Sequence, residues 1–190
     1  MPARFSLICH GATAATRAAA FPLDEPLEAH AMERAAALRG ALRRADRILV
    51  SPALRARQTA EALGLAASVD PLLRDGDHGR WNGRGIGEIQ AEDPEGLLAW
   101  RTDPEAAPHG GESLAAVMRR AAAWLDGQGR ASGHVVAVTH AAVIRAAILF
   151  AVGAPAAAFW HLDVGPLSLT DLRFDAARWT WRATSPTDWR

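Results

Sequence analysis

The chain has 190 residues, of which 49% are hydrophobic and 22% are charged. This balance excludes a disordered or fibrous chain, and the length suits a single globular domain over residues 1–190. All 21 cationic residues are arginines, and 21 acidic residues bring the formal net charge to zero. A chain without excess charge has no overall basic field, so we expect neither nucleic acid nor a membrane surface as a partner.

The cysteine count and the apolar segments bear on where the protein works. Cys9 is the single cysteine, which leaves no partner for an intrachain disulfide and favours a reducing compartment. The apolar run Phe5–Cys9 is too short for a signal peptide. The most apolar region, Val135–Phe159, contains His140 and Arg145 and is interpreted as a buried strand and helix. We therefore expect a cytoplasmic protein.

The first part of the chain alternates short apolar runs with helical patterns. Phe5–Cys9 and Arg47–Val50 are predicted as buried strands. Between them, Ala29–Arg44 has apolar residues at helical spacing and is predicted as a helix. After the second strand, Ser51 is expected as the N-cap of another helix, with Pro52 at its first position. The positions assigned to the apolar face of the first helix are Met32, Ala36, Leu38 and Leu42.

The second part begins with a loop rich in glycine and charge, Leu73–Gly87, and continues with short helices. A third buried strand, His134–Thr139, follows a longer helix and precedes another. The chain ends in a predicted hairpin or pair of edge strands. This order predicts an α/β fold, a three-layer α/β/α sandwich with a mainly parallel central sheet. The remaining predicted ranges are Gly87–Asp93 and Glu95–Trp100 for short helices, Leu114–Asp126 and Ala141–Val152 for long helices, and Leu167–Phe174 and Trp179–Ala183 for the final strands.

The three predicted inner strands each lead into a turn with a reactive side chain: His10, Arg55 and His140. Ligands of open α/β sheets bind at the carboxyl ends of the strands, so we expect these three to converge. A neutral imidazole can act as nucleophile or base, and an arginine beside a helix start can hold a phosphate. One buried histidine alone is as well explained by packing, but two favour a site. Asp75, or its competitor Asp77, could protonate a leaving group if its pKa is raised.

Five stretches occur in the order found in the histidine phosphatase superfamily, whose members have a phosphoglycerate mutase-like fold: ICHGAT, SPALRARQTAEAL, LLRDGDHGRWNG, HGGESL and VVAVTHAAVIR. The chain resembles this family from its start to about residue 150. The resemblance implies a phosphatase that needs no metal or cofactor and forms a phosphohistidine on His10. It implies that Arg55 and His140 hold the phosphoryl oxygens and that Asp75 protonates the leaving oxygen. The residues expected to bind the substrate or support its pocket are Gly11, Thr13, Arg17, Glu112 and Ser113.

Three positions depart from the family pattern: Cys9 replaces an arginine, Asp75 a glutamate and Thr16 an asparagine. The first departure matters most, because phosphoryl transfer depends on electrostatic stabilisation of the phosphoryl oxygens. Loss of one such donor typically lowers the rate by about 10²–10³. Arg17 or another arginine could supply the missing charge from a different direction.

Cys9 itself admits three interpretations. A cysteine-phosphatase loop needs an arginine six residues after the nucleophile, and that position holds Ala15. A zinc site could use Cys9, His10, His140 and Asp75 by ligand type, but adjacent residues of a strand point to opposite faces. We favour the third interpretation, in which Cys9 is a small apolar filler, and we expect no metal.

The favoured function is hydrolysis of a small phosphorylated metabolite. The alternative is a catalytically weak or inactive relative that binds a phosphorylated ligand or a protein partner. A mutase is less favoured, because the segment between Gly83 and Gly110 offers little cap over the site. Trp81 and Trp100 could line a pocket, although buried packing is the preferred interpretation. The later tryptophans could form a packed edge or a homodimer face, and they are Trp160, Trp179, Trp181 and Trp189.

Overall fold

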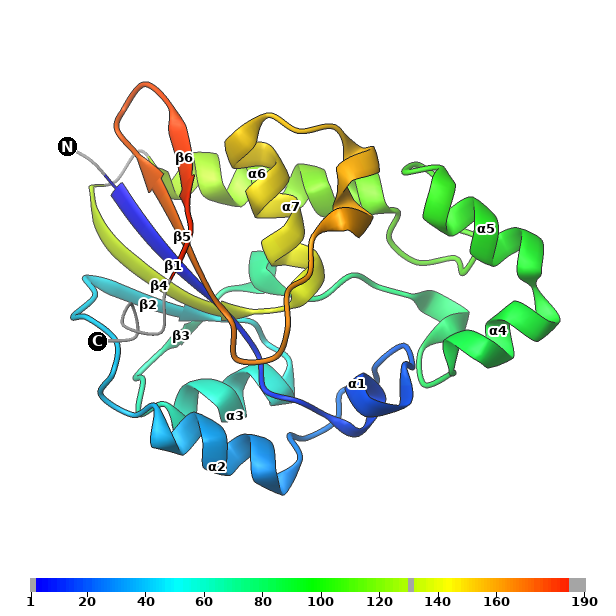
Figure 1. Ribbon diagram of the computed structural model, residues 1–190, viewed down its shortest axis with the longest axis horizontal. Helices are drawn as coiled ribbons and strands as arrows, with labels where there is room; N and C mark the ends of the chain where they lie inside the picture. The colour runs from blue at the N-terminus through cyan, green and yellow to red at the C-terminus, as the bar shows by residue number, and fades with distance from the viewer. Residues whose placement is uncertain (1–2, 130–131, 185–190) are drawn as a thin grey trace.

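The structure is a computed structural model that describes residues 3–129 and 132–184. Within these residues, six strands form one sheet in the order β3-β2-β4-β1-β5-β6 (Figure 1). The strands β1 to β4 run parallel, whereas β5 is antiparallel to β1 and β6 is antiparallel to β5. The mainly parallel sheet and the final hairpin are thereby confirmed. The bounds are β1 Ala3–Cys9, β2 Arg47–Val50, β3 Ser68–Val69, β4 Gly133–Thr139, β5 Leu169–Phe174 and β6 Trp179–Arg182.

Helices cover both faces of the sheet, α6 and α7 on one side and α2 and α3 on the other (Figure 1). Side chains alternate along β1, so Phe5 and Leu7 pack in the core below α6 and α7, while Ile8 belongs to the core below α2 and α3. This arrangement confirms the predicted three-layer α/β/α sandwich. The bounds are α2 Ala29–Ala37, α3 Leu54–Ala62, α6 Leu114–Gly129 and α7 Ala141–Val152.

The short elements extend beyond the carboxyl ends of the parallel strands, where α4 and α5 project away from the sheet (Figure 1). They have a small core of their own, in which Phe21, Trp81, Ile89 and Leu97 are buried. This layer stands over the edge of the sheet where a site is expected. The bounds are α1 Ala14–Ala18, α4 Ile86–Glu92, α5 Pro94–Thr102, and the 3₁₀ helices η1 Pro71–Leu73, η2 Gly79–Trp81 and η3 Ala156–His161. The sequence analysis predicts no counterpart for α1, for β3 or for the three 3₁₀ helices.

The prediction for α2 is wrong in both length and buried face. The helix ends at Ala37 and not at residue 44, shortly before Gly40, whose positive φ of 75° breaks helical geometry. Its buried residues are Ala31 and Ala35, whereas Met32 is 42% exposed. Small alanine side chains let the helix pack close to α3 and to the turn at Gly11, and this close approach selects a different face from the one with the larger apolar residues.

The predicted start of α3 is also wrong. The helix begins at Leu54 and not at Pro52, and Ser51 is not its N-cap. The first helical N–H, that of Leu54, donates to Asp24 Oδ1 at 2.7 Å. The helix start is therefore capped by a carboxylate from a distant loop and does not present this N–H group to a phosphate.

In the part of the chain that the structure describes, no helix is both long and apolar enough to cross a membrane. The cytoplasmic location, the single domain and the homodimer stay predictions.

Candidate active site

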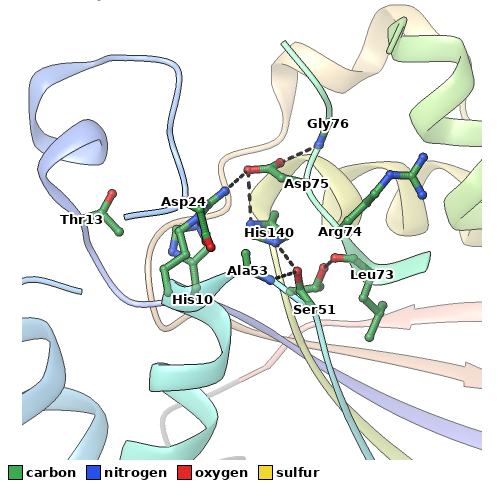
Figure 2. Close-up of polar contacts among 12 residues, drawn as sticks. His10, Thr13, Asp24, Ser51, Ala53, Leu73, Arg74, Asp75, Gly76 and His140 are labelled. Atoms are coloured by element: carbon green, nitrogen blue, oxygen red, sulfur yellow. Dashed lines mark hydrogen bonds and ion pairs between the residues drawn. The ribbon is translucent and has the colours of Figure 1, made fainter. Parts of the chain in front are cut away.

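The carboxyl ends of β1, β2 and β4 meet at one edge of the sheet and bring together side chains that are far apart in the sequence. His10 follows β1, Ser51 follows β2 and His140 follows β4 (Figure 2). Backbone hydrogen bonds fix these turns, since the N–H of His10 donates to Thr139 O and the N–H of Ser51 donates to Val138 O, both at 2.9 Å. The two imidazole ring centroids are 5.1 Å apart.

His10 is held in one tautomer by its own turn. Its Nδ1 lies 2.7 Å from the carbonyl oxygen of Gly11, which can only accept, so Nδ1 carries the proton. The Nε2 atom therefore keeps its lone pair, and it accepts a hydrogen bond from Arg55 Nε at 3.3 Å. Burial, together with the charge of nearby His140, lowers the pKa of His10 to about 4. At neutral pH the imidazole is unprotonated, as a nucleophile must be.

Arg55 is the central cation of the cluster and is only 4% exposed. Besides the bond to His10, its Nη2 donates to Asp75 Oδ2 at 2.7 Å, and its Nη1 donates to the carbonyl of Leu23 at 3.0 Å. Arg55 is the second residue of α3, and these three partners orient its guanidinium toward the His10 ring. Arg55 is thus positioned to contact any anion that approaches Nε2 of His10.

The Asp75 carboxylate bridges the cluster. Its Oδ2 contacts Arg55 and also lies 3.3 Å from His140 Nδ1, and its Oδ1 accepts from the N–H of Gly76 (Figure 2). Burial alone would raise the pKa of Asp75. The charges of His140, Arg55 and His78 outweigh burial and hold this pKa well below its usual range. A proton donor needs a raised pKa, and Asp75 does not meet this condition in the ligand-free site.

His140 is fully enclosed, with a relative exposure of 1%. Its Nε2 lies 2.7 Å from the hydroxyl of Ser51, on the opposite side of the ring from Asp75 (Figure 2). The Ser51 hydroxyl also accepts from the N–H of Ala53 at 3.3 Å. Sequence reasoning assigned Ser51 to a helix cap and missed this contact, because only the strand order places residue 51 beside residue 140.

Arg120, a buried arginine of α6, binds the backbone of the loop that carries Asp75. Its Nη1 donates to the carbonyls of Leu72 and Arg74, both at 2.8 Å, and its Nη2 donates to Asp75 O at 3.2 Å. Sequence reasoning missed Arg120 as well. A signal was present, because the residue lies three positions after Val117, on the face of α6 that is otherwise apolar.

Glu112 and Ser113 play different parts. Glu112 lines the cavity described below, and both of its oxygens bond to Arg120, at 3.0 and 2.7 Å. Ser113 immediately precedes α6, and its hydroxyl accepts from the N–H of Ala116 at 3.2 Å, as the hydroxyl of an N-cap does. Glu112 thus supports the wall of the site, and Ser113 fixes the start of the helix that provides Arg120.

Three predicted binding residues of the nucleophile loop have their donor groups engaged away from the reacting side chains. The N–H of Gly11 donates to Thr59 Oγ1 at 3.0 Å and is therefore occupied. Thr13 caps α1 by accepting from the N–H of Thr16, and it lies apart from the Asp75–His140 cluster (Figure 2). Arg17 has a side chain that is 77% exposed and pairs with Glu28 at 2.8 Å. The helix thus directs Arg17 to solvent in this structure, and a role for Arg17 at the phosphate stays a prediction.

Cys9 is 3% exposed and packs in the core below α6 and α7. Burial raises the pKa of its thiol to about 12, and the charge of Asp75 adds to this effect. The thiol is protonated at neutral pH, which argues against Cys9 as a nucleophile. Among the described residues, no group of three or more His, Cys, Asp or Glu side chains is arranged to hold a metal ion.

A cavity of about 320 Å³ opens beside the cluster. Its polar lining includes His10, Asp75, His78, Glu112 and Arg145. The rest of the wall is largely apolar, and its aromatic members are Phe21, Trp100, Phe159 and Trp160.

The tryptophan side chains lie in different environments. Trp81 is buried at 1% exposure, as predicted, whereas Trp100 and Trp160 line the cavity. Trp179 packs on Phe5, with ring centroids 5.2 Å apart. Trp181 is 46% exposed, and Trp189 lies outside the described residues.

The sequence profile of the histidine phosphatase superfamily (branch 1) matches residues 5–186. The chain belongs to this family. Solved structures agree with the assignment: mycobacterial glucosyl-3-phosphoglycerate phosphatase in complex with VO3 has a TM-score of 0.84 and 30% identity over 95% of this chain and 97% of that one. A putative alpha-ribazole-5'-P phosphatase from Escherichia coli has a TM-score of 0.86 and 27% identity over 97% of both chains.

Curated relatives match this chain over shorter stretches. A bifunctional protein of Mycobacterium tuberculosis is 33% identical over 138 residues, which are 68% of this chain and 38% of that protein. The glucosyl-3-phosphoglycerate phosphatase of Mycolicibacterium vanbaalenii is 38% identical over 104 residues, which are 52% of this chain and 46% of that protein. The chain thus spans less than half the length of these relatives. These relatives and the solved neighbours named above include phosphatases.

Proposed function

We propose that this histidine phosphatase hydrolyses the phosphomonoester of a small metabolite through a phosphohistidine on His10. One observation carries the proposal: the unprotonated Nε2 of His10 lies beside the guanidinium of Arg55, and His10 lines a cavity large enough for a small ligand. The phosphatases among the structural neighbours support it.

In the first step, Nε2 of His10 attacks phosphorus and the bond from phosphorus to the leaving oxygen breaks. Arg55 and His140 stabilise the negative charge on the phosphoryl oxygens. The Asp75 carboxyl transfers its proton to the leaving oxygen, which departs as an alcohol.

Asp75 must gain that proton after the substrate binds, because its pKa is low in the ligand-free site. A phosphate dianion places negative charge beside the carboxylate and competes with it for Arg55 and His140. Both effects raise the pKa of Asp75. Substrate binding therefore converts Asp75 into a proton donor.

In the second step, a water molecule attacks the phosphohistidine. The Asp75 carboxylate takes a proton from this water while the N–P bond breaks. Inorganic phosphate leaves, His10 is restored, and Asp75 releases its proton to solvent as the site returns to the ligand-free state.

Hydrolysis of an aryl phosphate at pH 5–8 tests the proposal, with His10→Ala as the inactive variant. His30→Ala is the matched control, since the side chain of His30 is 59% exposed and lies on α2. We expect His10→Ala to lose at least about 10³-fold in turnover and His30→Ala to keep its rate. Rapid quenching should trap an acid-labile phosphoryl group on His10, and EDTA should not lower the rate. Equal rates in the wild type and in His10→Ala would refute the proposal.

The buried thiol at position 9 favours the alternative, a weak or inactive relative that binds a phosphorylated ligand or a protein partner. The family resemblance implies an arginine there, and Cys9 supplies no charge to a phosphoryl group. If that charge is missing, Cys9→Arg should raise the turnover by about 10²–10³. A wild type that binds vanadate but turns over no phosphomonoester would favour the binding role.

A further inference from the structure

The chain between α1 and α2 forms a strap, residues 21–27, that lies against the start of α3. Its two ends are anchored in the protein, since Phe21 is 5% exposed and Leu27 is 6% exposed. Its middle is not, because Leu23 is 59% exposed and Asp24 is exposed as well. Burial therefore fixes the ends of the strap, whereas the position of its middle depends on polar contacts.

Two hydrogen bonds hold the middle of the strap on the first turn of α3. Asp24 Oδ1 accepts from the N–H of Leu54 at 2.7 Å, and the carbonyl of Leu23 accepts from Arg55 Nη1 at 3.0 Å. Leu54 and Arg55 are the first two residues of α3. One short stretch of the strap therefore contacts both the backbone from which Arg55 projects and the guanidinium itself.

The same helix is also bonded to the turn that carries the nucleophile. The N–H of Gly11 donates to Thr59 Oγ1 at 3.0 Å, and Thr59 Oγ1 donates to the carbonyl of Arg55 at 2.7 Å. At the end of the strap, the N–H of Leu27 donates to Gln58 Oε1 at 2.8 Å. Residues 11–27 are thus bonded to α3 at both ends, and these bonds set the register between the nucleophile turn and the helix.

The strap also borders the active-site cavity. Pro22 lines the cavity beside His10, and it lines a second cavity of about 370 Å³ as well. The wall of the second cavity includes Asp24 and Arg55. The strap therefore extends along the site from the nucleophile to the cation.

The three partners of Arg55 differ in what the proposed reaction requires of them. Nε2 of His10 must leave Arg55 to attack phosphorus, and Asp75 loses its negative charge when it takes up a proton. The carbonyl of Leu23 takes no part in the chemistry, so its bond to Nη1 can persist through both steps. A guanidinium that is held at a fixed point is preorganised to stabilise the phosphoryl oxygens.

We propose, resting on the proposed phosphatase function, that Asp24 is a positioning residue. It holds the strap on α3 and thereby keeps the guanidinium of Arg55 at the phosphoryl group. Asp24 itself does not touch the substrate. It acts as a hydrogen-bond acceptor, so the oxygen at the N–H of Leu54 is required and the negative charge is not.

Two substitutions at one position test this role, with an aryl phosphate as the substrate. Asp24→Ala removes the acceptor, and we expect kcat to fall about 5- to 30-fold, the loss that corresponds to a missing N-cap. Asp24→Asn keeps an oxygen in the same place and should restore kcat to within about twofold of the wild type. A wild-type rate in Asp24→Ala, or equal losses in both variants, would overturn the role of Asp24.

The matched control is Asp175→Ala. Asp175 is an exposed carboxylate that accepts from the N–H of Ala177 at 3.0 Å, in the turn after β5. This turn follows Phe174, which pairs with Ala3 at the start of β1, so it lies at the end of the sheet opposite the site. We expect Asp175→Ala to keep the wild-type rate.

A double-mutant cycle with Arg55→Gln separates positioning from a general loss of stability. Because Asp24 acts through Arg55, Asp24→Ala should lower kcat by less than about twofold in the Arg55→Gln background. Urea unfolding shows that each variant is folded under the assay conditions. Losses of equal size in the two backgrounds would mean that Asp24 acts on the fold as a whole, and the positioning role would be wrong.

Vanadate binding separates this inference from the proposed function, because calorimetry measures it without turnover. Asp24→Ala should weaken vanadate binding about 5- to 30-fold in the wild-type background and by less than about twofold with Arg55→Gln. If the wild type hydrolyses no phosphomonoester but shows this pattern, the phosphatase proposal fails and the role of Asp24 stands. If the wild type does not bind vanadate, Arg55 holds no phosphoryl-like anion and the role of Asp24 is wrong.

Discussion

At the scale of single residues, the chemistry of His10 follows from two neighbours. The carbonyl of Gly11 fixes the proton on Nδ1, and Arg55 lies at Nε2. Burial lowers the pKa of His10 below the value of about 6.5 that an exposed imidazole has, so the nucleophile stays neutral in mildly acidic solution.

We predict that the imidazole resonances of His10 titrate in the free enzyme with a midpoint near pH 4. The physical reason is the desolvation of the ring, reinforced by the charge of His140. Histidine C–H signals followed by NMR from pH 8 to the acid limit of the folded state provide the measurement, and His10→Gln assigns the signal. A midpoint close to 6.5 would show that the ring is solvated and that the buried geometry is wrong.

A second residue-scale prediction concerns Ser51. Ser51→Ala removes the hydroxyl that lies 2.7 Å from His140 Nε2 and leaves a buried ring nitrogen without its partner. Loss of such a bond costs about 1–3 kcal/mol, so we expect turnover to fall about 5- to 150-fold while the fold persists.

Ser168→Ala is the matched control for this change, because the Ser168 hydroxyl is buried without a hydrogen-bond partner. Steady-state kinetics of the two variants provide the comparison. If both variants keep the wild-type rate, Ser51 does not orient His140.

At the scale of elements, the site is assembled by helices that do not themselves supply the nucleophile. α6 contributes Arg120, which reaches three carbonyls of the segment before Gly76 and fixes the path of the chain around Asp75. Thr139, at the end of β4, adds a bond from its hydroxyl to Leu73 O at 2.7 Å. The position of Asp75 is thus set from the core of the fold.

We predict that Arg120→Met lowers the free energy of unfolding by about 3–5 kcal/mol, because it leaves the Glu112 carboxylate and three carbonyls without their buried cation. Turnover should fall as well, since the Asp75 loop loses its support. Urea unfolding and steady-state rates test both effects. The neighbouring variant Arg119→Met should change neither, and a loss of the same size there would mean that the effect is not specific to the loop.

At the scale of the whole molecule, four buried or partly buried histidines make stability depend on pH, and all four act with the same sign. Burial lowers the pKa of His10, His78, His109 and His134 below the ordinary value of 6.5. The unfolded chain therefore binds more protons than the folded chain once the pH falls below about 6.5.

We predict that the free energy of unfolding falls as the pH is lowered from 7 to 4.5, because each of these histidines binds a proton less readily in the folded state than in the unfolded chain. Below this range the depressed pKa of Asp75 acts with the same sign. Urea titrations at several pH values give the slope. His10→Gln should flatten it, and a slope that is unchanged in this variant would contradict the lowered pKa of His10.

Much of this architecture could be predicted from the sequence because its signals are local. The apolar run before His10 and the run before His140 marked β1 and β4, and the turn residues after them marked the site edge. The contact of Ser51 with His140 and the exposure of Arg17 depend on strand order and helix orientation, which a linear pattern does not contain. The pKa of Asp75 could not be predicted either, since its direction depends on which cations surround the buried carboxylate.

Because Cys9 is buried, the reactivity of the chain's single thiol is a probe for local opening of the site. Reagents such as iodoacetamide attack thiolates, so native Cys9 is protected by its pKa of about 12 and by the core around it. The thiol lies on the face of β1 that α6 and α7 cover, so alkylation requires these helices to move away from the sheet. The next residue in the chain is His10, so each such opening also disturbs the turn that holds the nucleophile. The alkylation rate of Cys9 therefore reports how often the active site opens, and we expect an anion bound at His10 to lower this rate.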